Sequence, residues 1–243
     1  MTGFWLALGF LTILPTPQRK YPDYDLSRAA EWFVVVGLIV GALLVLAVRL
    51  LSVVLPPLLV AVLATGLWAG LTGGLHLDGV ADCGDGLLTA TTPHRRLEIM
   101  RDPRTGAFGV LALVLVVLLK TAALQAYATG TAPLTILWLA PIIARWLLLF
   151  AGRMPSARPD GLGAAFANSW RMSQVWRPTI AVGVAVGLGG WRSGLALALA
   201  LLAALGVWYV AQRRLGGLTG DVLGLTVETA EIAMLIGGLA GLA

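Results

Sequence analysis

Residues Gly73–Gly86 read GGLHLDGVADCGDG, a polar stretch in a chain that is otherwise strongly apolar. Asp78, Asp82 and Asp85 stand at positions i, i+4 and i+7, so on a helix their carboxylates share one face. Like charges placed in this way repel, which calls for a cation among them. Oxygen ligands without a thiolate cluster favour Mg²⁺ over zinc. The alternative is a solvated loop whose acidic residues have no role.

The composition indicates a membrane protein. The 243 residues are 58% hydrophobic and 12% charged, with a mean hydropathy of +0.88, whereas soluble domains average roughly 25% charged residues. We therefore expect an all-α, polytopic integral membrane helix bundle, one transmembrane catalytic domain over 1–243. The single Cys83 excludes an internal disulfide and any multi-cysteine metal site. The start of the chain lacks a basic region and a small-residue cleavage site, so no removable signal peptide is expected.

Long apolar runs predict about seven membrane spans, at about 32–55, 58–74, 107–127, 134–151, 179–190, 194–211 and 222–242. The N-terminal apolar segment, 3–14, is only twelve residues long, and a full crossing needs about 20 residues. It is therefore either a short tilted span or a re-entrant helix.

The basic residues predict the orientation of the spans. Lys and Arg gather in alternate loops, at 16–31, 76–106, 152–178 and 212–221, and are almost absent from the connections between them. The positive-inside rule places these basic loops in the cytoplasm and the C-terminus on the opposite side. The same distribution explains the net charge of +5, so we expect a lipid bilayer and no nucleic acid as the partner.

A second polar motif, RDPRTGAFG at residues 101–109, stands just before a predicted span. Arg101 and Arg104 beside Gly106 are suited to binding phosphate oxygens. Ordinary anchoring by positive charges at the membrane surface explains the same residues equally well.

A third motif, GGLTGDVLG at residues 216–224, opens the last predicted span. Its glycine-rich entry, with Gly217 and Thr219, is a candidate for phosphate binding. Asp221 and Glu228 are seven residues apart and therefore share one helical face. Carboxylates in a span are costly, so both are candidates for a site that the first motif completes.

Three further residues carry open alternatives. His76 is a metal ligand, a proton carrier or simply a hydrogen-bonding residue. Arg145 lies within an apolar run, where it could counter the acidic motif, clamp a phosphate or form a structural ion pair. Glu231 is compatible with a hydrogen bond between helices.

Carboxylates that hold magnesium, next to arginines at a membrane surface, favour transfer of a phosphoryl-type group. The metal would bridge a pyrophosphate and neutralise the leaving phosphate, and the protein would hold an alcohol in line with it. The residues identify neither the alcohol nor the donor.

The chain resembles the cobalamin synthases, the adenosylcobinamide-GDP ribazoletransferases, over nearly its whole length. The resemblance rests on residues 73–86 and, in the family's order, on Phe10–Pro17, Arg101–Gly106, Ala144-Arg145, Gly161-Leu162-Gly163 with Phe166, and Gly216–Asp221. The first and last of these motifs are highly specific together.

The resemblance implies that α-ribazole, or its 5′-phosphate, attacks the pyrophosphate of adenosylcobinamide-GDP to give adenosylcobalamin, or its 5′-phosphate, and GMP. It also implies Mg²⁺ as cofactor and the cell inner membrane as location. Self-association, or association with other nucleotide-loop enzymes, stays open. The roles that it implies are metal binding by Asp78, Asp82, Asp85 and Asp221, catalysis by Asp82, Asp221, Glu228 and His76, and phosphate binding by Arg101, Arg104, Arg145, Gly106, Gly217 and Thr219.

Two rival functions follow from the same residues. A CDP-alcohol phosphotransferase also uses clustered aspartates, but its usual motif has an Ala-Arg pair where Ala81-Asp82 stands here. An ion-coupled transporter would favour broken helices at mid-membrane depth and inverted repeats. The acidic motifs lie at span ends on one side, and no repeat is detected.

Overall fold

The computed structural model describes residues 2–17, 26–160, 164 and 171–242, and in these ranges every regular element is a helix. The predicted motif residues Gly161–Gly163 and Phe166 lie outside the described residues. The helices are α1 (Thr2–Leu11), α2 (Leu26–Ala30), α3 (Phe33–Leu51), α4 (Pro57–Leu71), α5 (Leu75–Leu88), α6 (Pro93–Ile99), α7 (Ala107–Ala128), α8 (Leu134–Ala151), α10 (Ser173–Leu188), α11 (Gly190–Leu215) and α12 (Gly220–Gly238). The predicted all-α membrane bundle is confirmed.

Fewer helices are long and apolar enough to cross a membrane than the seven runs suggested. Four qualify in the described chain, namely the helix that ends at Leu51, α7, α8 and α11, and a fifth is added if α4 and α5 form one broken span. The runs at 179–190 and 222–242 fall in α10, which has 16 residues, and in α12, which carries three carboxylates. The ten residues of α1 rise only about 15 Å, half of a hydrocarbon core, so α1 does not cross as a helix.

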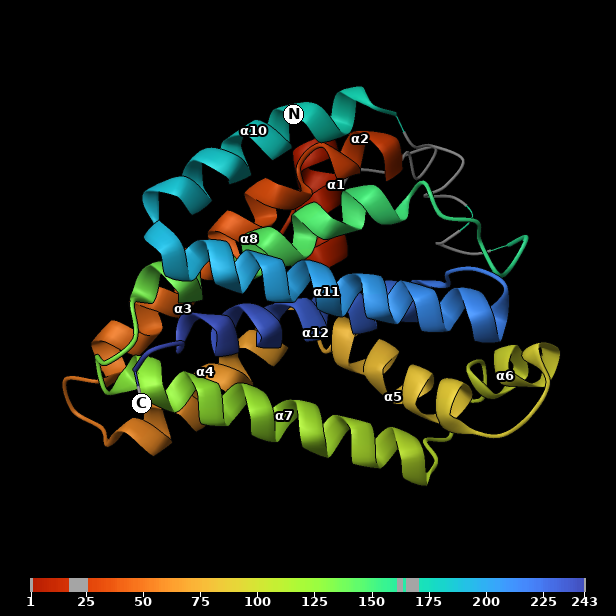
Figure 1. The fold of residues 1–243 in the computed structure, drawn as a ribbon, viewed down its shortest axis with the longest axis horizontal. Helices are drawn as coiled ribbons and strands as arrows, with labels where there is room; N and C mark the ends of the chain where they lie inside the picture. Colours follow the sequence, from red (N-terminus) through yellow and green to blue (C-terminus); the bar gives the residue numbers. More distant parts are fainter. Residues whose placement is uncertain (1, 18–25, 161–163, 165–170, 243) are drawn as a thin grey trace.

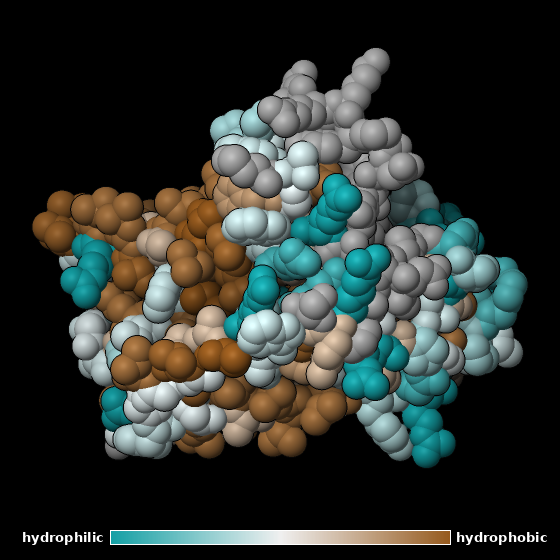
Figure 2. All heavy atoms as spheres, turned by 90° about the horizontal axis from the view of Figure 1, so that it is seen from above, coloured by the Kyte–Doolittle hydropathy of each residue, from teal (hydrophilic) through white to brown (hydrophobic). Residues whose placement is uncertain are grey.

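Helix α8 is the centre of the bundle, with α3, α10, α11 and α12 around it (Figure 1). Most of its side chains are buried, whereas α7 and α11 expose large apolar side chains on their outer faces, among them Leu118 and Leu202. Figure 2 shows this apolar surface over much of the molecule and hydrophilic side chains gathered towards the end where α6 lies. An apolar exterior of this kind is expected of a protein that faces lipid.

The chain bends by 92° between α4 and α5. Gly73 and Gly74 both have positive φ, 60° and 71°, a conformation that glycine adopts without a steric penalty. The N–H of Ile13, just after α1, donates to the carbonyl of Leu71 at 2.9 Å. The short N-terminal helix therefore satisfies a carbonyl at the break that starts the acidic motif.

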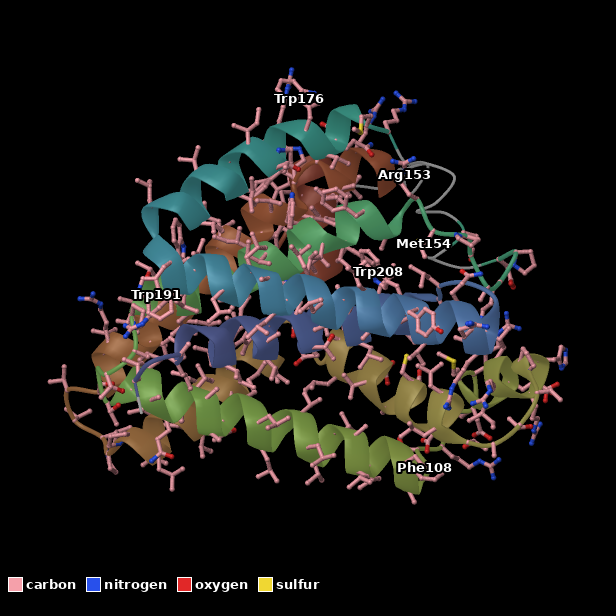
Figure 3. All side chains as sticks on the ribbon, viewed as in Figure 1. Phe108, Arg153, Met154, Trp176, Trp191 and Trp208 are labelled. Atoms are coloured by element: carbon pink, nitrogen blue, oxygen red, sulfur yellow. The ribbon has the colours of Figure 1, made fainter. Side chains whose placement is uncertain are left out.

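The basic loops after α5, α8 and α11 meet at one end of the bundle, while the α3–α4 and α7–α8 connections and the C-terminus lie at the other (Figure 1). Exposed aromatic side chains mark both ends, with Trp191 at one and Phe108 at the other (Figure 3). This grouping agrees with the alternation of basic loops in the sequence.

Candidate active site

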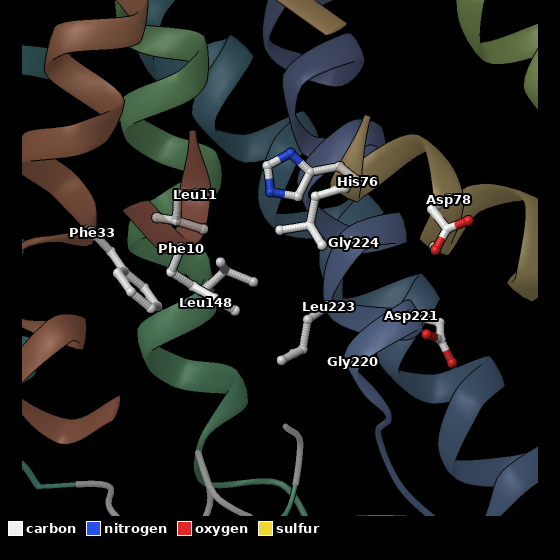
Figure 4. A pocket seen from close by; sticks show the side chains of 12 residues that line it. Phe10, Leu11, Phe33, His76, Asp78, Leu148, Gly220, Asp221, Leu223 and Gly224 are labelled. Carbon is white, nitrogen blue, oxygen red and sulfur yellow. The ribbon is translucent and has the colours of Figure 1, made fainter. Parts of the chain in front are cut away.

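Helices α5 and α12 cross so closely that one glycine is required at the contact. A Cβ at Gly79 would lie 2.6 Å from the carbonyl oxygen of Asp221. This contact brings the first turn of α12 beside the acidic face of α5, and the charged groups that act on Asp82 are led by Asp221 and Asp78. Figure 4 shows Asp78 and Asp221 on the same side of a pocket, from the two helices. We call Asp78, Asp82 and Asp221 the acidic cluster.

Thr219 orients Asp221. As the residue before α12, Thr219 accepts a hydrogen bond from the Val222 N–H at 3.3 Å and donates its hydroxyl to Asp221 Oδ2 at 3.2 Å. Its side chain is buried. Thr219 was predicted to bind phosphate, but the structure engages its hydroxyl in capping the helix and in holding an acidic side chain.

Arg158 is a cation that pairs with Asp221 of the acidic cluster. The backbones of Ser156 and Leu218 form an isolated parallel bridge, in which the Leu218 N–H donates to the Pro155 carbonyl at 2.8 Å. This bridge places Arg158 Nη1 3.5 Å from Asp221 Oδ2, while Nη2 donates to the carbonyl of Leu97.

Gly217 makes the bridge possible. A Cβ at Gly217 would lie 2.5 Å from the Pro155 carbonyl oxygen, so this glycine admits a neighbouring backbone. Gly217 was predicted to bind phosphate, but in the structure the backbone at Pro155 lies against it.

Asp85 faces the start of α7. Its carboxylate accepts the N–H groups of Gly106, at 2.6 Å, and Gly109, at 2.9 Å. The negative charge also suits the positive end of the helix dipole. Asp85 was predicted as a metal ligand and Gly106 as a phosphate contact, but the structure joins them to each other, so that Asp85 fastens α5 to α7.

The predicted phosphate-binding arginines after α6 are both paired and exposed. Arg104 donates two hydrogen bonds to the Asp102 carboxylate, at 2.9 and 2.7 Å, and Arg101 Nη2 lies 3.2 Å from Asp160 Oδ1. The hydrogen bonds from Arg104 lower the pKa of Asp102 to about 2. Pairs this exposed contribute little to stability, so a phosphate could compete for either guanidinium.

Deeper in the bundle, four charged side chains form what we call the buried quartet, consisting of Lys120, Arg145, Glu228 and Glu231. Lys120 Nζ donates to Glu228 at 2.6 Å and to Glu231 at 2.7 Å. Arg145, fully buried, pairs with Glu231 through Nη1. The structure thus places Glu228, a predicted catalytic residue, and Arg145, a predicted phosphate ligand, in an internal ion-pair network. Of the alternatives for Arg145, it favours the structural pair.

His76 lies on the opposite face of α5 from Asp78, as two-residue spacing on a helix requires (Figure 4). Its side chain is buried, and neither ring nitrogen has a hydrogen-bond partner. The ring lines a cavity of about 110 Å³ whose wall also includes Phe10, Phe33 and Leu148. A shared metal site with the acidic cluster is not supported by this placement.

The sequence profile for cobalamin-5-phosphate synthase matches residues 3–239. The chain belongs to this family. Among curated relatives, a protein of Desulfitobacterium hafniense is 37% identical over 98% of this chain and 96% of its own length. A Pseudomonas putida protein is 42% identical over the full length of both chains, and one from Syntrophobacter fumaroxidans is 40% identical over 96% of each. All three are named adenosylcobinamide-GDP ribazoletransferase. No solved structure matches the chain significantly.

In this member of the cobalamin-5-phosphate synthase family, the chemistry of the acidic cluster suits Mg²⁺, because all its donors are carboxylate oxygens. Among the described residues, no group of three or more His, Cys, Asp or Glu side chains is arranged to hold a metal by itself. Magnesium, however, is usually bound by one or two carboxylates together with substrate phosphates. Asp78, Asp82 and Asp221 offer carboxylates for a site of that kind, in which one or two of them would bind the ion and the substrate would complete it.

Two charged positions of this synthase-family chain, one beside the acidic cluster and one in the buried quartet, escaped the sequence reasoning. Arg158 is one of several arginines in its loop, and no spacing distinguishes it. Lys120 stands inside an apolar run, and the charge itself was the available signal, since a lone lysine in a span needs a partner.

Proposed function

We propose that the protein is an adenosylcobinamide-GDP ribazoletransferase, which joins adenosylcobinamide-GDP to α-ribazole, or to its 5′-phosphate, and releases GMP. Membership of the family supports this proposal. The structural observation that carries it is the acidic cluster, in which α5 and α12 bring three carboxylates near one another and Arg158 pairs with the carboxylate of Asp221. Such an excess of negative charge is suited to a divalent cation and a diphosphate.

In the proposed step, an oxygen of a ribazole ribose hydroxyl forms a bond to the phosphorus nearer the cobinamide. The bond between that phosphorus and the bridging oxygen breaks, so that GMP leaves with the bond electrons. The hydroxyl proton passes to a carboxylate of the acidic cluster. Asp78, Asp82 and Asp221 would hold Mg²⁺, which when bound neutralises charge on the diphosphate.

The other residues of the proposed site hold these groups in place. Arg158 keeps Asp221 in position and offers its guanidinium to a diphosphate oxygen, for which the planar fork of arginine is well suited. Thr219 fixes Asp221 from the other side, and Asp85 keeps α5 and α7 together. The protein thereby contributes mainly alignment of the alcohol with the phosphorus.

We also propose that the end of the bundle that carries α6 faces the cytoplasm of a bacterial cell, in the inner membrane. The clustering of basic loops at that end supports this orientation. In this orientation the acidic cluster opens towards the compartment that holds soluble nucleotides.

One observation favours the rival function as an ion-coupled transporter, namely that α4 and α5 form a broken helix pair. The family match favours the transferase, since the named relatives are transferases over their full length.

One assay tests the proposed function against both rivals. Purified protein in detergent or nanodiscs is incubated with Mg²⁺, adenosylcobinamide-GDP and α-ribazole, and GMP and the corrinoid product are measured. We expect equal amounts of the two products, and neither when α-ribazole is left out. Absence of both products in the complete mixture, from protein that is folded by circular dichroism, would overturn the proposal.

A further inference from the structure

The cavity beside His76 is the feature that the proposed chemistry leaves unexplained. Its wall is formed mostly by apolar side chains from α1, α3, α8 and α12, including Leu11, Phe33 and Leu223 (Figure 4). The cavity is also lined by Asp78, Gly220, Asp221 and Gly224. It is therefore a mostly apolar chamber whose wall includes two carboxylates of the acidic cluster.

His76 is the polar group inside this chamber without a partner. The side chain is 3% exposed, and both Nδ1 and Nε2 lack a hydrogen-bond partner. A buried polar group left unsatisfied loses the hydrogen bonds it made to water, so such groups are usually paired. An orphaned imidazole that lines a cavity indicates a ligand that pairs with it there.

We propose that this chamber holds the benzimidazole base of α-ribazole, with an imidazole N–H of His76 donating to the free ring nitrogen of the base. This inference rests on the proposed function and assigns a part of its second substrate. A benzimidazole riboside presents a flat apolar ring with one free acceptor nitrogen, and its other ring nitrogen carries the ribose. The chamber offers apolar walls and one donor, and the ribose would project towards Asp78 and Asp221, where the reacting phosphate is held.

The other parts of the two substrates fit the chamber less well. Guanine carries several donors and acceptors, and His76 could satisfy only one or two of them, so the rest would be buried unpaired at a cost in affinity. The corrin ring is far larger than a cavity of about 110 Å³. A lipid acyl chain suits the apolar wall but gives His76 no partner.

The test compares four variants with the parent protein. His76→Phe removes the donor and keeps a ring, His76→Gln restores an N–H donor, and Leu223→Phe fills the chamber. Leu202→Phe is the matched control, because the same change is made on the outer face of α11, where Leu202 is 65% exposed. Circular dichroism and thermal unfolding establish that each variant is folded.

For each protein we measure the KM for α-ribazole and the KM for adenosylcobinamide-GDP separately. Equilibrium dialysis measures the binding of α-ribazole alone. We expect His76→Phe and Leu223→Phe to raise the KM for α-ribazole about tenfold or more, with the KM for adenosylcobinamide-GDP within about twofold. His76→Gln should recover part of the loss, Leu202→Phe should match the parent, and guanosine should not displace α-ribazole.

The outcomes separate this inference from the proposed function. If the parent protein forms no GMP, the proposed function fails, and the inference fails with it. If the parent is active and His76→Phe and Leu223→Phe keep its KM for α-ribazole, only the inference is overturned. An equal rise in both KM values would also overturn it. So would displacement of bound α-ribazole by added phospholipid in the dialysis experiment.

Discussion

Helix α12 carries carboxylates in two contrasting settings. At its first turn, Asp221 belongs to the acidic cluster, where three carboxylates lie near one another and, among the described residues, Arg158 pairs with one of them. About two turns further along, Glu228 and Glu231 belong to the buried quartet, where two carboxylates face two cations. One helix therefore presents both an unbalanced and a balanced group of charges.

The difference shows how carboxylates in an apolar bundle can be sorted by their partners. An ion in the bilayer is costly unless it is paired, and each charge of the buried quartet has an opposite charge beside it, although Nε and Nη2 of Arg145 have no hydrogen-bond partner in the described part of the chain. The acidic cluster is not balanced in this way, because among the described residues Asp221 pairs with Arg158 whereas no ion pair is found for Asp78 or Asp82. The buried quartet is suited to holding helices together, and the acidic cluster is suited to binding a ligand.

The largest expected effect is on folding, from Lys120→Met. This change leaves both glutamates of the buried quartet with Arg145 alone and buries one uncompensated charge, which costs about 3–5 kcal/mol. Unfolding in detergent, followed by circular dichroism, measures the loss. Adding Glu228→Gln to the same variant rebalances the charges and should recover much of the stability. Equal stability of Lys120→Met and the parent would mean that the quartet does not hold the helices together.

The next effect is on catalysis, from Asp82→Asn. Loss of one charge from the acidic cluster should lower the rate of GMP release by about 10²–10³-fold, because stabilisation of the transferring phosphate is weakened. The amount of protein in the membrane and its unfolding temperature should stay near those of the parent. Full turnover by this variant would remove Asp82 from the proposed metal site.

A smaller effect is expected from Arg158→Gln, which removes the cation beside Asp221. We expect a loss of about 10–100-fold in kcat/KM for adenosylcobinamide-GDP, which is typical when a group that orients a metal ligand is removed. Arg158→Lys keeps the charge but not the planar fork, so it should recover only part of the activity. A lysine variant as active as the parent would show that charge alone is needed at this position.

The smallest effect is on stability, from Gly109→Ala. The added Cβ would lie 2.5 Å from Asp85 Oδ2, so either the carboxylate or α7 must shift, at a cost of about 1–3 kcal/mol. Gly183→Ala is the control, since nothing lies within 4 Å of the Cβ position there. The unfolding temperature should fall for Gly109→Ala and stay level or rise slightly for Gly183→Ala. A fall in both would indicate that the contact with Asp85 is not the cause.

Part of the site follows from the sequence, because helical spacing and loop charge are local properties. The spacing of Asp78 and Asp82 predicted a shared face, and the distribution of basic residues predicted that Asp221 lies at the same end. The same spacing also assigned Asp85 to the metal. Only the tertiary structure shows the N–H groups of α7 in front of that carboxylate.

The roles of the deeper charges depend on contacts between distant segments. Glu228 shares a helical face with Asp221, so spacing joins them, but Lys120 comes from a helix more than a hundred residues earlier in the chain. Arg158 reaches Asp221 through a backbone bridge between two irregular loops, which carries no periodic signal. Pairings of this kind are set by packing, which a single sequence does not display.

The pairing of α7, α8 and α12 also constrains how the protein is made. Synthesis proceeds from the N-terminus, so Lys120 and Arg145 reach the bilayer before either glutamate has left the ribosome. Until then each cation needs water, lipid phosphate or the insertion machinery as a temporary counter-charge. Completion of the last helix is therefore the moment at which α7 and α8 become stable in the lipid, and nascent chains that end before Glu228 should be prime substrates for membrane quality-control proteases.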